Sequence, residues 1–262
     1  MINTLEIPKS LESLKNPPKR LYYTGNRKLL DNFKIAIVGT RRPNQHTQII
    51  TTTLAQKISK YATIISGGAI GVDFIAHLNS MPNTIMISPS SLDITYPKEN
   101  SKLINDIKNK ALMISEYESS YFPKKYSFLE RNRIVIALSD IVIFPQGDLN
   151  SGTNYSAKVA IELNKPIWTI PHRYKESPLT ESLIINGNAK VIYDIDNFIK
   201  DYIPDSKIQN IESLESKSDE ILEFCKNAPS FEIALERFGD KILEYEFMGL
   251  LVRQNNKIKT KW

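Results

Sequence analysis

The chain has 262 residues, of which 24% are charged and 41% hydrophobic, and its formal net charge is +5. This composition is ordinary for a water-soluble globular protein, and the length allows one large domain with a small appended one. Because Cys225 is the single cysteine, an internal disulfide and a cysteine-based zinc cluster are excluded.

Charge is unevenly distributed along the chain. Residues 201–262 carry a net charge of −3, so residues 1–200 carry +8. A basic main domain favours a polyanionic partner, although a lysine-rich surface without such a partner explains the charge equally well. The N-terminus has no apolar run typical of a secretory signal, and no segment resembles a membrane span. We therefore expect a cytoplasmic protein without a membrane span.

Short apolar runs alternate with helical patterns over most of the chain. The runs predict strands at residues 34–38, 63–66, 84–88, 111–115, 140–144, 167–170 and 190–193. The segments between them predict helices at residues 45–60, 69–78, 98–109, 128–138, 153–163 and 179–185. Strands that alternate with helices form parallel sheets through βαβ crossovers. The predicted fold class is therefore α/β, doubly wound and Rossmann-like, with ligands bound beyond the carboxyl ends of the strands.

The flanking segments suggest four parts. Residues 1–33 are predicted to form an irregular lead-in that packs on the main domain, residues 34–200. The polar stretch 201–217 predicts a linker. Residues 218–262 contain two helical patterns, at 220–226 and 231–238, followed by a hairpin signal at Asn255-Asn256. Helices followed by a hairpin are typical of a small winged-helix-like module.

The stretch SGGAIGVDFIAH, residues 66–77, places Gly67, Gly68 and Gly71 between a predicted strand and a predicted helix. Their spacing matches neither the dinucleotide-binding fingerprint nor the P-loop. Glycines at such a turn let backbone N–H groups approach an anion, and the helix N-terminus adds partial positive charge. The turn therefore predicts a phosphate cradle. The alternative is a tight strand-to-helix turn without a ligand.

Asp73 and His77 lie four residues apart on the same predicted helix. This spacing allows a shared hydrogen bond or a shared metal ion, but no further Asp, Glu or His cluster lies nearby in sequence. We therefore expect a structural contact between the two side chains, no metal site and no cofactor. The other histidines, His46 and His172, are scattered, and no G-x-S-x-G motif is present, so we predict no catalytic residues.

Two arginines follow the first strand of the main domain. The stretch VGTRRP, residues 38–43, puts Arg41 and Arg42 at the sheet edge where ligands bind. Their planar guanidinium groups suit phosphate. A salt bridge to a carboxylate on a neighbouring loop is the alternative.

The stretch PKKYSFLERNRIVIALSD, residues 123–140, contains a helix that is apolar all round at IVIAL, which predicts burial. Arg131 and Arg133 lie near its start. A cation there is destabilised by the helix dipole unless a nearby anion compensates its charge. That anion is either a bound phosphate backbone or an internal carboxylate, Glu116 or Glu130. Basic and aromatic side chains are interleaved just upstream, as single-stranded nucleic acid requires: Lys124, Lys125, Tyr126 and Phe128.

Together and in this order, the motifs resemble the DNA-processing protein A family, also called Smf. The resemblance covers nearly the whole chain and includes PPKRLYYTGN, IAIVGTRRP, SGGAIGVDFIAH, DITYPKEN, ISEY, FLERNRIVIALSD, SGT and NGNAKVI. It implies a cytoplasmic homodimer that binds single-stranded DNA in natural transformation, protects it and helps to load the RecA recombinase. It implies no enzymatic activity and no cofactor.

The motifs and the resemblance together predict which residues contact DNA. These are Gly39, Thr40, Arg41, Arg42, Ser66, Gly67, Gly68, Lys124, Lys125, Phe128, Arg131 and Asn132. The C-terminal module resembles the degenerate winged-helix domain found in many family members. The net negative charge of this segment argues against direct DNA binding by the module.

An enzyme is the alternative function. Small-molecule phosphoribohydrolases that resemble the cytokinin-activating group combine doubly wound sheets with a P-G-G-x-G-T-x-x-E signature. The nearest stretch here is PQGDLNSGTNYSA, residues 145–157, which keeps Gly-Thr but lacks the glutamate at the expected position. This absence favours a DNA-binding protein. A scaffold for protein contacts is a third possibility.

Overall fold

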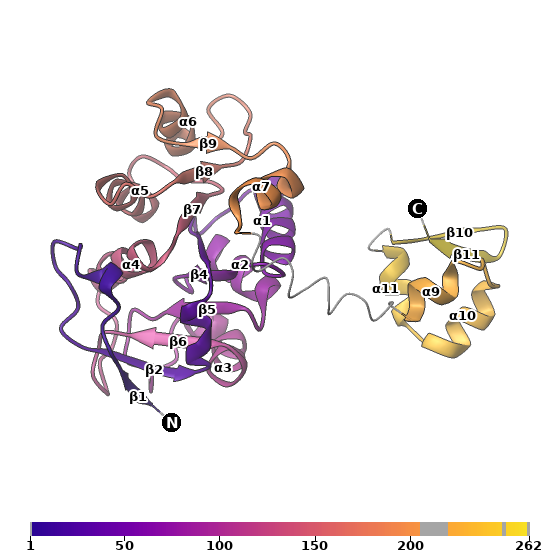
Figure 1. The fold of residues 1–262 in the computed structure, drawn as a ribbon, viewed down its shortest axis with the longest axis horizontal. Helices are drawn as coiled ribbons and strands as arrows, with labels where there is room; N and C mark the ends of the chain where they lie inside the picture. The colour runs from indigo at the N-terminus through magenta and orange to yellow at the C-terminus, as the bar shows by residue number, and fades with distance from the viewer. Residues whose placement is uncertain (1, 205–219, 248–249, 261–262) are drawn as a thin grey trace. The chain divides into compact units, whose positions relative to one another are not determined.

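The chain divides into two compact units, Met1–Asp205 and Ser206–Trp262 (Figure 1). The computed structural model describes residues 2–204, 220–247 and 250–260. The predicted linker begins inside a helix, because α7 runs over Ile195–Tyr202; its residues 205–217 lie outside the described residues. None of the helices in the described ranges combines the length and the apolar character that a membrane crossing requires.

A nine-stranded sheet forms the centre of the larger unit, with the strand order β1-β2-β6-β5-β4-β3-β7-β8-β9. The strands from β6 to β9 in this order run parallel, whereas β1 and β2 pair antiparallel at one edge. The predicted doubly wound α/β fold is thus confirmed. The strands are Asn3–Leu5 (β1), Leu21–Gly25 (β2), Lys34–Ile37 (β3), Thr63–Ser66 (β4), Thr84–Ile87 (β5), Leu112–Ser115 (β6), Ile141–Phe144 (β7), Ile167–Thr169 (β8) and Lys190–Val191 (β9).

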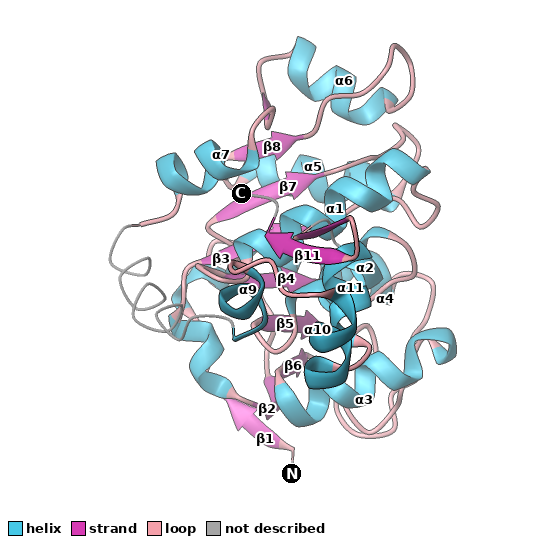
Figure 2. Cartoon of the chain, turned by 90° about the vertical axis from the view of Figure 1, so that its right-hand side faces the viewer, coloured by secondary structure: helices cyan, strands magenta, loops and turns pink. Residues whose placement is uncertain are grey.

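The central strands form because each is a short, continuous apolar run. Every residue of β4, β5, β6 and β7 is buried, as expected for parallel strands covered on both faces. The register places Ile35 beside Ile64 on one side and beside Ile141 on the other. Figure 2 shows the arrowheads of β5, β7 and β8 pointing to one edge of the sheet. The turns that follow these strands therefore gather at that edge.

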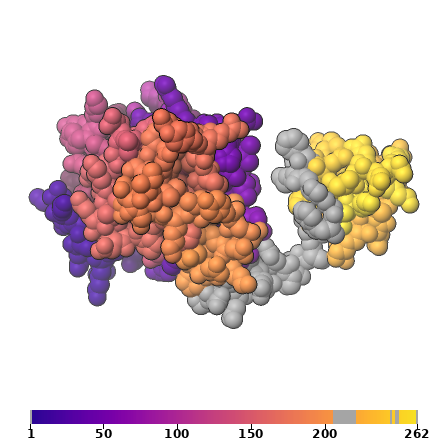
Figure 3. All heavy atoms as spheres, turned by 90° about the horizontal axis from the view of Figure 1, so that it is seen from above, coloured from indigo at the N-terminus to yellow at the C-terminus, as the bar shows by residue number. Residues whose placement is uncertain are grey.

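Helices cover both faces of the sheet (Figure 1). Side chains of α1, α2 and α7 pack in one core with Ile37 and Ile143, and side chains of α4, α5 and α6 pack in the other. Seen from the β9 end, the orange residues of α6, β9 and α7 close that end of the unit (Figure 3). The remaining helix bounds are Gln45–Ile58 (α1), Val72–Ser80 (α2), Ser101–Lys110 (α3), Ser127–Leu138 (α4), Gly152–Glu162 (α5) and Pro178–Ile185 (α6).

The lead-in is more regular than predicted. Residues 1–33 contain β1, β2 and two short 3-10 helices, Lys9–Leu11 and Arg27–Asp31. The strand LYYTG (β2) pairs with β6 and buries Leu21 completely. Its aromatic and β-branched composition is typical of a strand, but the prolines just before it obscured the pattern. The lead-in therefore extends the sheet instead of only packing against it.

The described residues of the smaller unit form three helices and a hairpin. Its core contains Ile221, Cys225, Ala234, Ile242, Leu251 and Ile258. Asn255 and Asn256 connect the two strands with φ of +49° and +58°, which is the geometry of a type I′ turn, so the predicted hairpin is confirmed. The winged-helix interpretation stays a prediction. The elements are Glu220–Cys225 (α9), Phe231–Phe238 (α10), Lys241–Phe247 (α11), Leu251–Gln254 (β10) and Lys257–Thr260 (β11).

Candidate nucleic-acid interface

A cavity of about 160 Å³ lies beyond the carboxyl ends of β3, β4 and β5. Its walls come from the turns after these three strands and from the start of α4. Segments far apart in sequence meet here because the strands are parallel, and ligands of doubly wound folds bind at this edge. The lining residues are Arg41, Gly67, Gly68, Ala69, Ile70, Pro89, Tyr96, Pro97, Glu99, Phe128 and Arg131.

Phe128 forms one wall of the cavity. Its half-buried ring lies 5.7 Å from the ring of Tyr96, measured between centroids. The guanidinium carbon of Arg41 lies 5.3 Å from the Phe128 centroid. A cation beside an accessible aromatic ring offers a nucleotide both of the contacts it needs, a partner for its phosphate and a stacking surface for its base.

Arg131 forms the floor of the cavity, although it is only 2% exposed. Its Nη1 donates to the carbonyl of Ile87 at 2.6 Å, and its Nε donates to Oδ1 of Asn132 at 2.9 Å. The guanidinium lies against Gly67, where an added Cβ would stand 2.3 Å from Cζ, so a larger residue there would have to displace the guanidinium. Burial, partly offset by the negative charge of Asp73, lowers the pKa of Arg131 to about 10. The floor therefore remains cationic at neutral pH.

The turn between β4 and α2 contains a buried carboxyl group. Asp73, in the first turn of α2, is 3% exposed and accepts the N–H of Ala69 at 3.3 Å. Burial raises the pKa of Asp73, and the charge of Arg131 opposes that rise. Gly71 precedes the helix with a φ of +84°, and a Cβ there would lie 2.5 Å from the carbonyl oxygen of Thr40. The glycines allow close packing at this turn, and the Asp73 carboxyl group lies at the same helix N-terminus; the phosphate cradle stays a prediction.

His77 does not bond to Asp73, contrary to our expectation. Its Nδ1 lies 2.7 Å from Oγ1 of Thr84, whose hydroxyl donates to the carbonyl of Ile64, so Nδ1 is the donor in this contact. Burial lowers the pKa of His77 to about 3, so the ring is neutral at physiological pH. Both side chains are structural, but each has its own partner.

Arg133 forms an ion pair with a carboxylate of the same protein, Glu116. Its Nη1 and Nη2 donate to the two carboxylate oxygens of Glu116 at 3.1 and 2.8 Å, and both side chains are 12% exposed. A further bond runs from Arg133 to the carbonyl of Glu130. For Arg133, the internal carboxylate that we considered as the alternative to phosphate is thus confirmed.

A comparison with models of protein families assigns the chain to one family. The family model described as DNA recombination-mediator protein A matches residues 1–203. The chain belongs to this family.

Solved structures of DNA processing protein A are similar to this member of the DNA recombination-mediator protein A family. The protein from Helicobacter pylori, whose structure is described for its unique single-stranded DNA binding mode, is 51% identical with a TM-score of 0.74. That match covers 76% of this chain and 94% of the other. The protein from Streptococcus pneumoniae is 30% identical with a TM-score of 0.72, covering 76% and 74% of the two chains.

Curated relatives of the chain are named Protein Smf or DNA processing protein DprA. Protein Smf from Synechocystis sp. is 34% identical over 71% of this chain and 49% of its own length. DNA processing protein DprA from Bacillus subtilis is 30% identical over 80% of this chain and 73% of its own length. The chain thus spans about half the length of Protein Smf, and 59% of the length of the DprA from Streptococcus pneumoniae.

The structure brings together part of the DNA-contact set predicted for this DNA recombination-mediator protein A member. The predicted residues that line the cavity are Arg41, Gly67, Gly68, Phe128 and Arg131. Gly39 and Thr40 lie just before them in the turn after β3. Arg42, Lys124 and Lys125 are exposed but do not line the cavity. Lys124 places Nζ 6.0 and 5.9 Å from the ring centroids of Tyr121 and Tyr126, so cations and aromatic rings lie side by side there too.

Two of the residues predicted to contact DNA have internal partners. Ser66 is fully buried, and its Oγ donates to the carbonyl of Ile37 at 2.6 Å. Asn132 accepts from Arg131 and donates from Nδ2 to Oγ of Ser156 at 3.0 Å. These bonds hold the two side chains beside the cavity, and their contact with DNA stays a prediction.

Sequence reasoning missed the loop after β5, which supplies Pro89, Tyr96, Pro97 and Glu99 to the cavity. Residues 88–97 contain neither glycine nor arginine, so no phosphate-binding pattern marks this loop. The motif DITYPKEN, which contains Tyr96, carried part of the family resemblance and was the signal available.

Proposed function

We propose that this chain binds single-stranded DNA in the cavity, with a phosphate at Arg41 and a base on Phe128. The observation that carries the proposal is the guanidinium of Arg41 5.3 Å from the Phe128 ring, in a cavity whose floor is the buried Arg131. The similarity to the Helicobacter pylori protein supports it. Contacts to phosphates and ring faces do not read base edges, so binding has no strong sequence preference.

We further propose, from family membership, that the chain takes part in natural transformation as a cytoplasmic homodimer. In this role it protects incoming single strands and helps to load RecA. It acts by binding and not as an enzyme. A nuclease-protection assay and a RecA filament-nucleation assay, each with and without the protein, test the two activities separately.

The affinity for single strands is expected to fall with salt. With about four basic contacts, the logarithm of the binding constant falls with the logarithm of salt concentration at a slope of roughly −3. Arg41→Ala should weaken binding and make the slope shallower by about 0.7, because one phosphate contact is lost. Fluorescence anisotropy of a labelled oligonucleotide across a salt series measures both effects.

The control for Arg41→Ala is Lys158→Ala, which removes an exposed charge on α5 outside the cavity. It should leave the slope unchanged. A slope near zero for the unchanged protein would refute the electrostatic part of the proposal.

The enzyme alternative makes a separate prediction. A phosphoribohydrolase would release free base from nucleoside monophosphates, whereas a DNA-binding protein would not. Chromatographic analysis after prolonged incubation with purine and pyrimidine monophosphates distinguishes the two. Base release above the no-protein control would favour the enzyme.

Deleting residues 218–262 is expected to leave a folded protein that still binds single strands. The larger unit has its own cores and contains the whole cavity, whereas the smaller unit has a separate core. Circular dichroism and the anisotropy assay on the shortened chain test this. Loss of all binding with an intact spectrum would show that the smaller unit is needed for DNA binding.

A further inference from the structure

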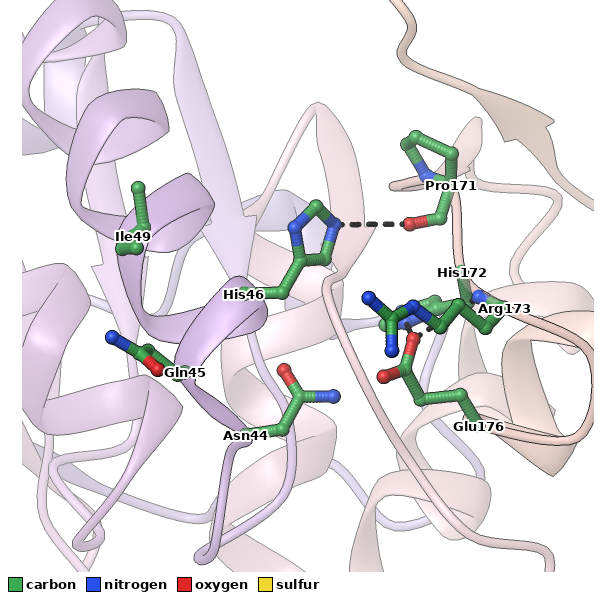
Figure 4. A pocket seen from close by; sticks show the side chains of 8 residues that line it. All are labelled: Asn44, Gln45, His46, Ile49, Pro171, His172, Arg173 and Glu176. Atoms are coloured by element: carbon green, nitrogen blue, oxygen red, sulfur yellow. Dashed lines mark hydrogen bonds and ion pairs between the residues drawn. The ribbon is translucent and has the colours of Figure 1, made fainter.

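A second cavity, of about 610 Å³, lies between the start of α1 and the segment after β8 (Figure 4). The strand that leads into α1 is β3, which pairs with β4 on one side and β7 on the other. The order of the strands along the chain reverses across β3, and ligands of doubly wound sheets bind preferentially at such a switch point. This position makes the second cavity a candidate site, independent of the first.

The second cavity contains one buried hydrogen-bond donor without an acceptor and one exposed cation, Arg173. The side-chain nitrogen of Asn44 is buried and has no partner, whereas its Oδ1 accepts the N–H of Thr47 and so fixes the orientation of the amide. Figure 4 shows this nitrogen directed towards the side of the pocket that carries Arg173 and Glu176. Among the described residues, no carboxylate forms an ion pair with the guanidinium of Arg173. Buried donors are nearly always paired in proteins, so the unpaired nitrogen of Asn44 favours a ligand that supplies an acceptor oxygen.

A metal ion does not fit the histidines of this pocket. Nε2 of His46 lies 3.2 Å from the carbonyl oxygen of Pro171, and Nε2 of His172 lies 2.6 Å from that of Pro145. Nδ1 of His172 faces Oε2 of Glu176 at 3.3 Å. The described part of the chain contains no group of three His, Cys, Asp or Glu side chains placed to hold a metal. The two imidazoles, whose centroids are 6.2 Å apart, therefore act as walls.

Glu176 limits the negative charge that the pocket accepts. Its Oε2 accepts the backbone N–H of Arg173 at 3.0 Å, and this bond lowers the pKa of the carboxyl group, so Glu176 is ionised and braces the loop. One carboxylate beside one guanidinium leaves little excess positive charge. A ligand with a single phosphate is therefore favoured over a triphosphate.

The geometry points to a phosphate-binding site for a nucleotide, in which Asn44 Nδ2 and the guanidinium of Arg173 donate to the phosphate oxygens. The nucleotide is either part of a bound strand or a free mononucleotide; the first source rests on the proposed function, and the second does not. Arg41 in the first cavity and Asn44 in the second are at most about 11 Å apart along the chain. A strand that leaves the first cavity is thus able to reach the second.

The full-length chain is titrated by calorimetry with thymidine 5′-monophosphate, inorganic phosphate and thymidine triphosphate. Asn44→Asp keeps the oxygen that caps α1 but replaces the unpaired donor by a negative oxygen, and Arg173→Ala removes the cation. Each should weaken monophosphate binding by at least about ten-fold, which corresponds to about 1.4 kcal/mol. Lys175→Ala, which removes a charge from the same loop, is the matched control. Triphosphate should bind more weakly than monophosphate.

A second experiment measures the affinity of the same variants for labelled oligonucleotides of increasing length. If only longer strands lose affinity in Asn44→Asp and Arg173→Ala, the nucleotide belongs to the strand; if only the monophosphate does, the ligand is free. Unchanged affinity for the monophosphate, for phosphate and for every strand in both variants would overturn the inference. If Phe128→Ala still weakens strand binding in that case, the proposed function stands and only this inference fails.

Discussion

Replacing Arg131 by methionine is expected to lower the free energy of unfolding by about 3–5 kcal/mol, the range found when one partner of a buried charged network is removed. The change leaves the carbonyl of Ile87 and the side chain of Asn132 without their donors. It also leaves the buried carboxylate of Asp73 without the positive charge that stabilises its ionised form. Urea unfolding followed by circular dichroism measures the loss.

The control for Arg131→Met is the double variant with Asp73→Asn. Because the second change removes the carboxylate left uncompensated, the double variant should regain part of the lost stability. If Arg131→Met alone left the free energy of unfolding unchanged but abolished binding of single strands, the expected loss of stability would be contradicted. Arg131 would then serve DNA binding alone.

Phe128→Ala is expected to weaken single-strand binding by about 1–3 kcal/mol, the usual cost of losing one base–aromatic stack. The ring is half-buried, lines the cavity and contacts Arg41 and Tyr96, and it is not part of the hydrophobic clusters of the larger unit. Its removal should therefore cost less stability than the roughly 3–5 kcal/mol of a core phenylalanine. Anisotropy titration and thermal unfolding of the same preparation separate the two effects.

Phe128→Leu refines this test because leucine keeps most of the apolar volume but has no ring face. It should retain stability and lose most of the affinity that alanine loses. Tyr174→Ala, at a side chain that is 81% exposed and outside the first cavity, is the aromatic control. A collapsed melting temperature with normal binding by the folded fraction would make Phe128 a core residue.

Local patterns in the sequence were sufficient for the architecture of the larger unit. Each central strand is a short apolar run, and parallel strands covered on both faces need such runs. IVIAL predicted the buried end of α4, since a helix that is apolar all round has no face for solvent. The Asn255-Asn256 pair predicted the hairpin, because asparagine tolerates positive φ. These features depend on neighbouring residues only.

The tertiary structure decided which partners the polar side chains have. Nothing in the sequence distinguishes Arg131, buried on Gly67, from Arg133, paired with Glu116, because what packs over each guanidinium comes from distant segments. The charge that opposes the pKa rise of Asp73 likewise comes from a distant residue, Arg131, and not from His77 on the same helix. His46 and His172, scattered in sequence, share one pocket because β3 and β8 end at the same edge of the sheet. Strand order is set by long-range pairing, so sites made by several strand ends were decided only by the fold.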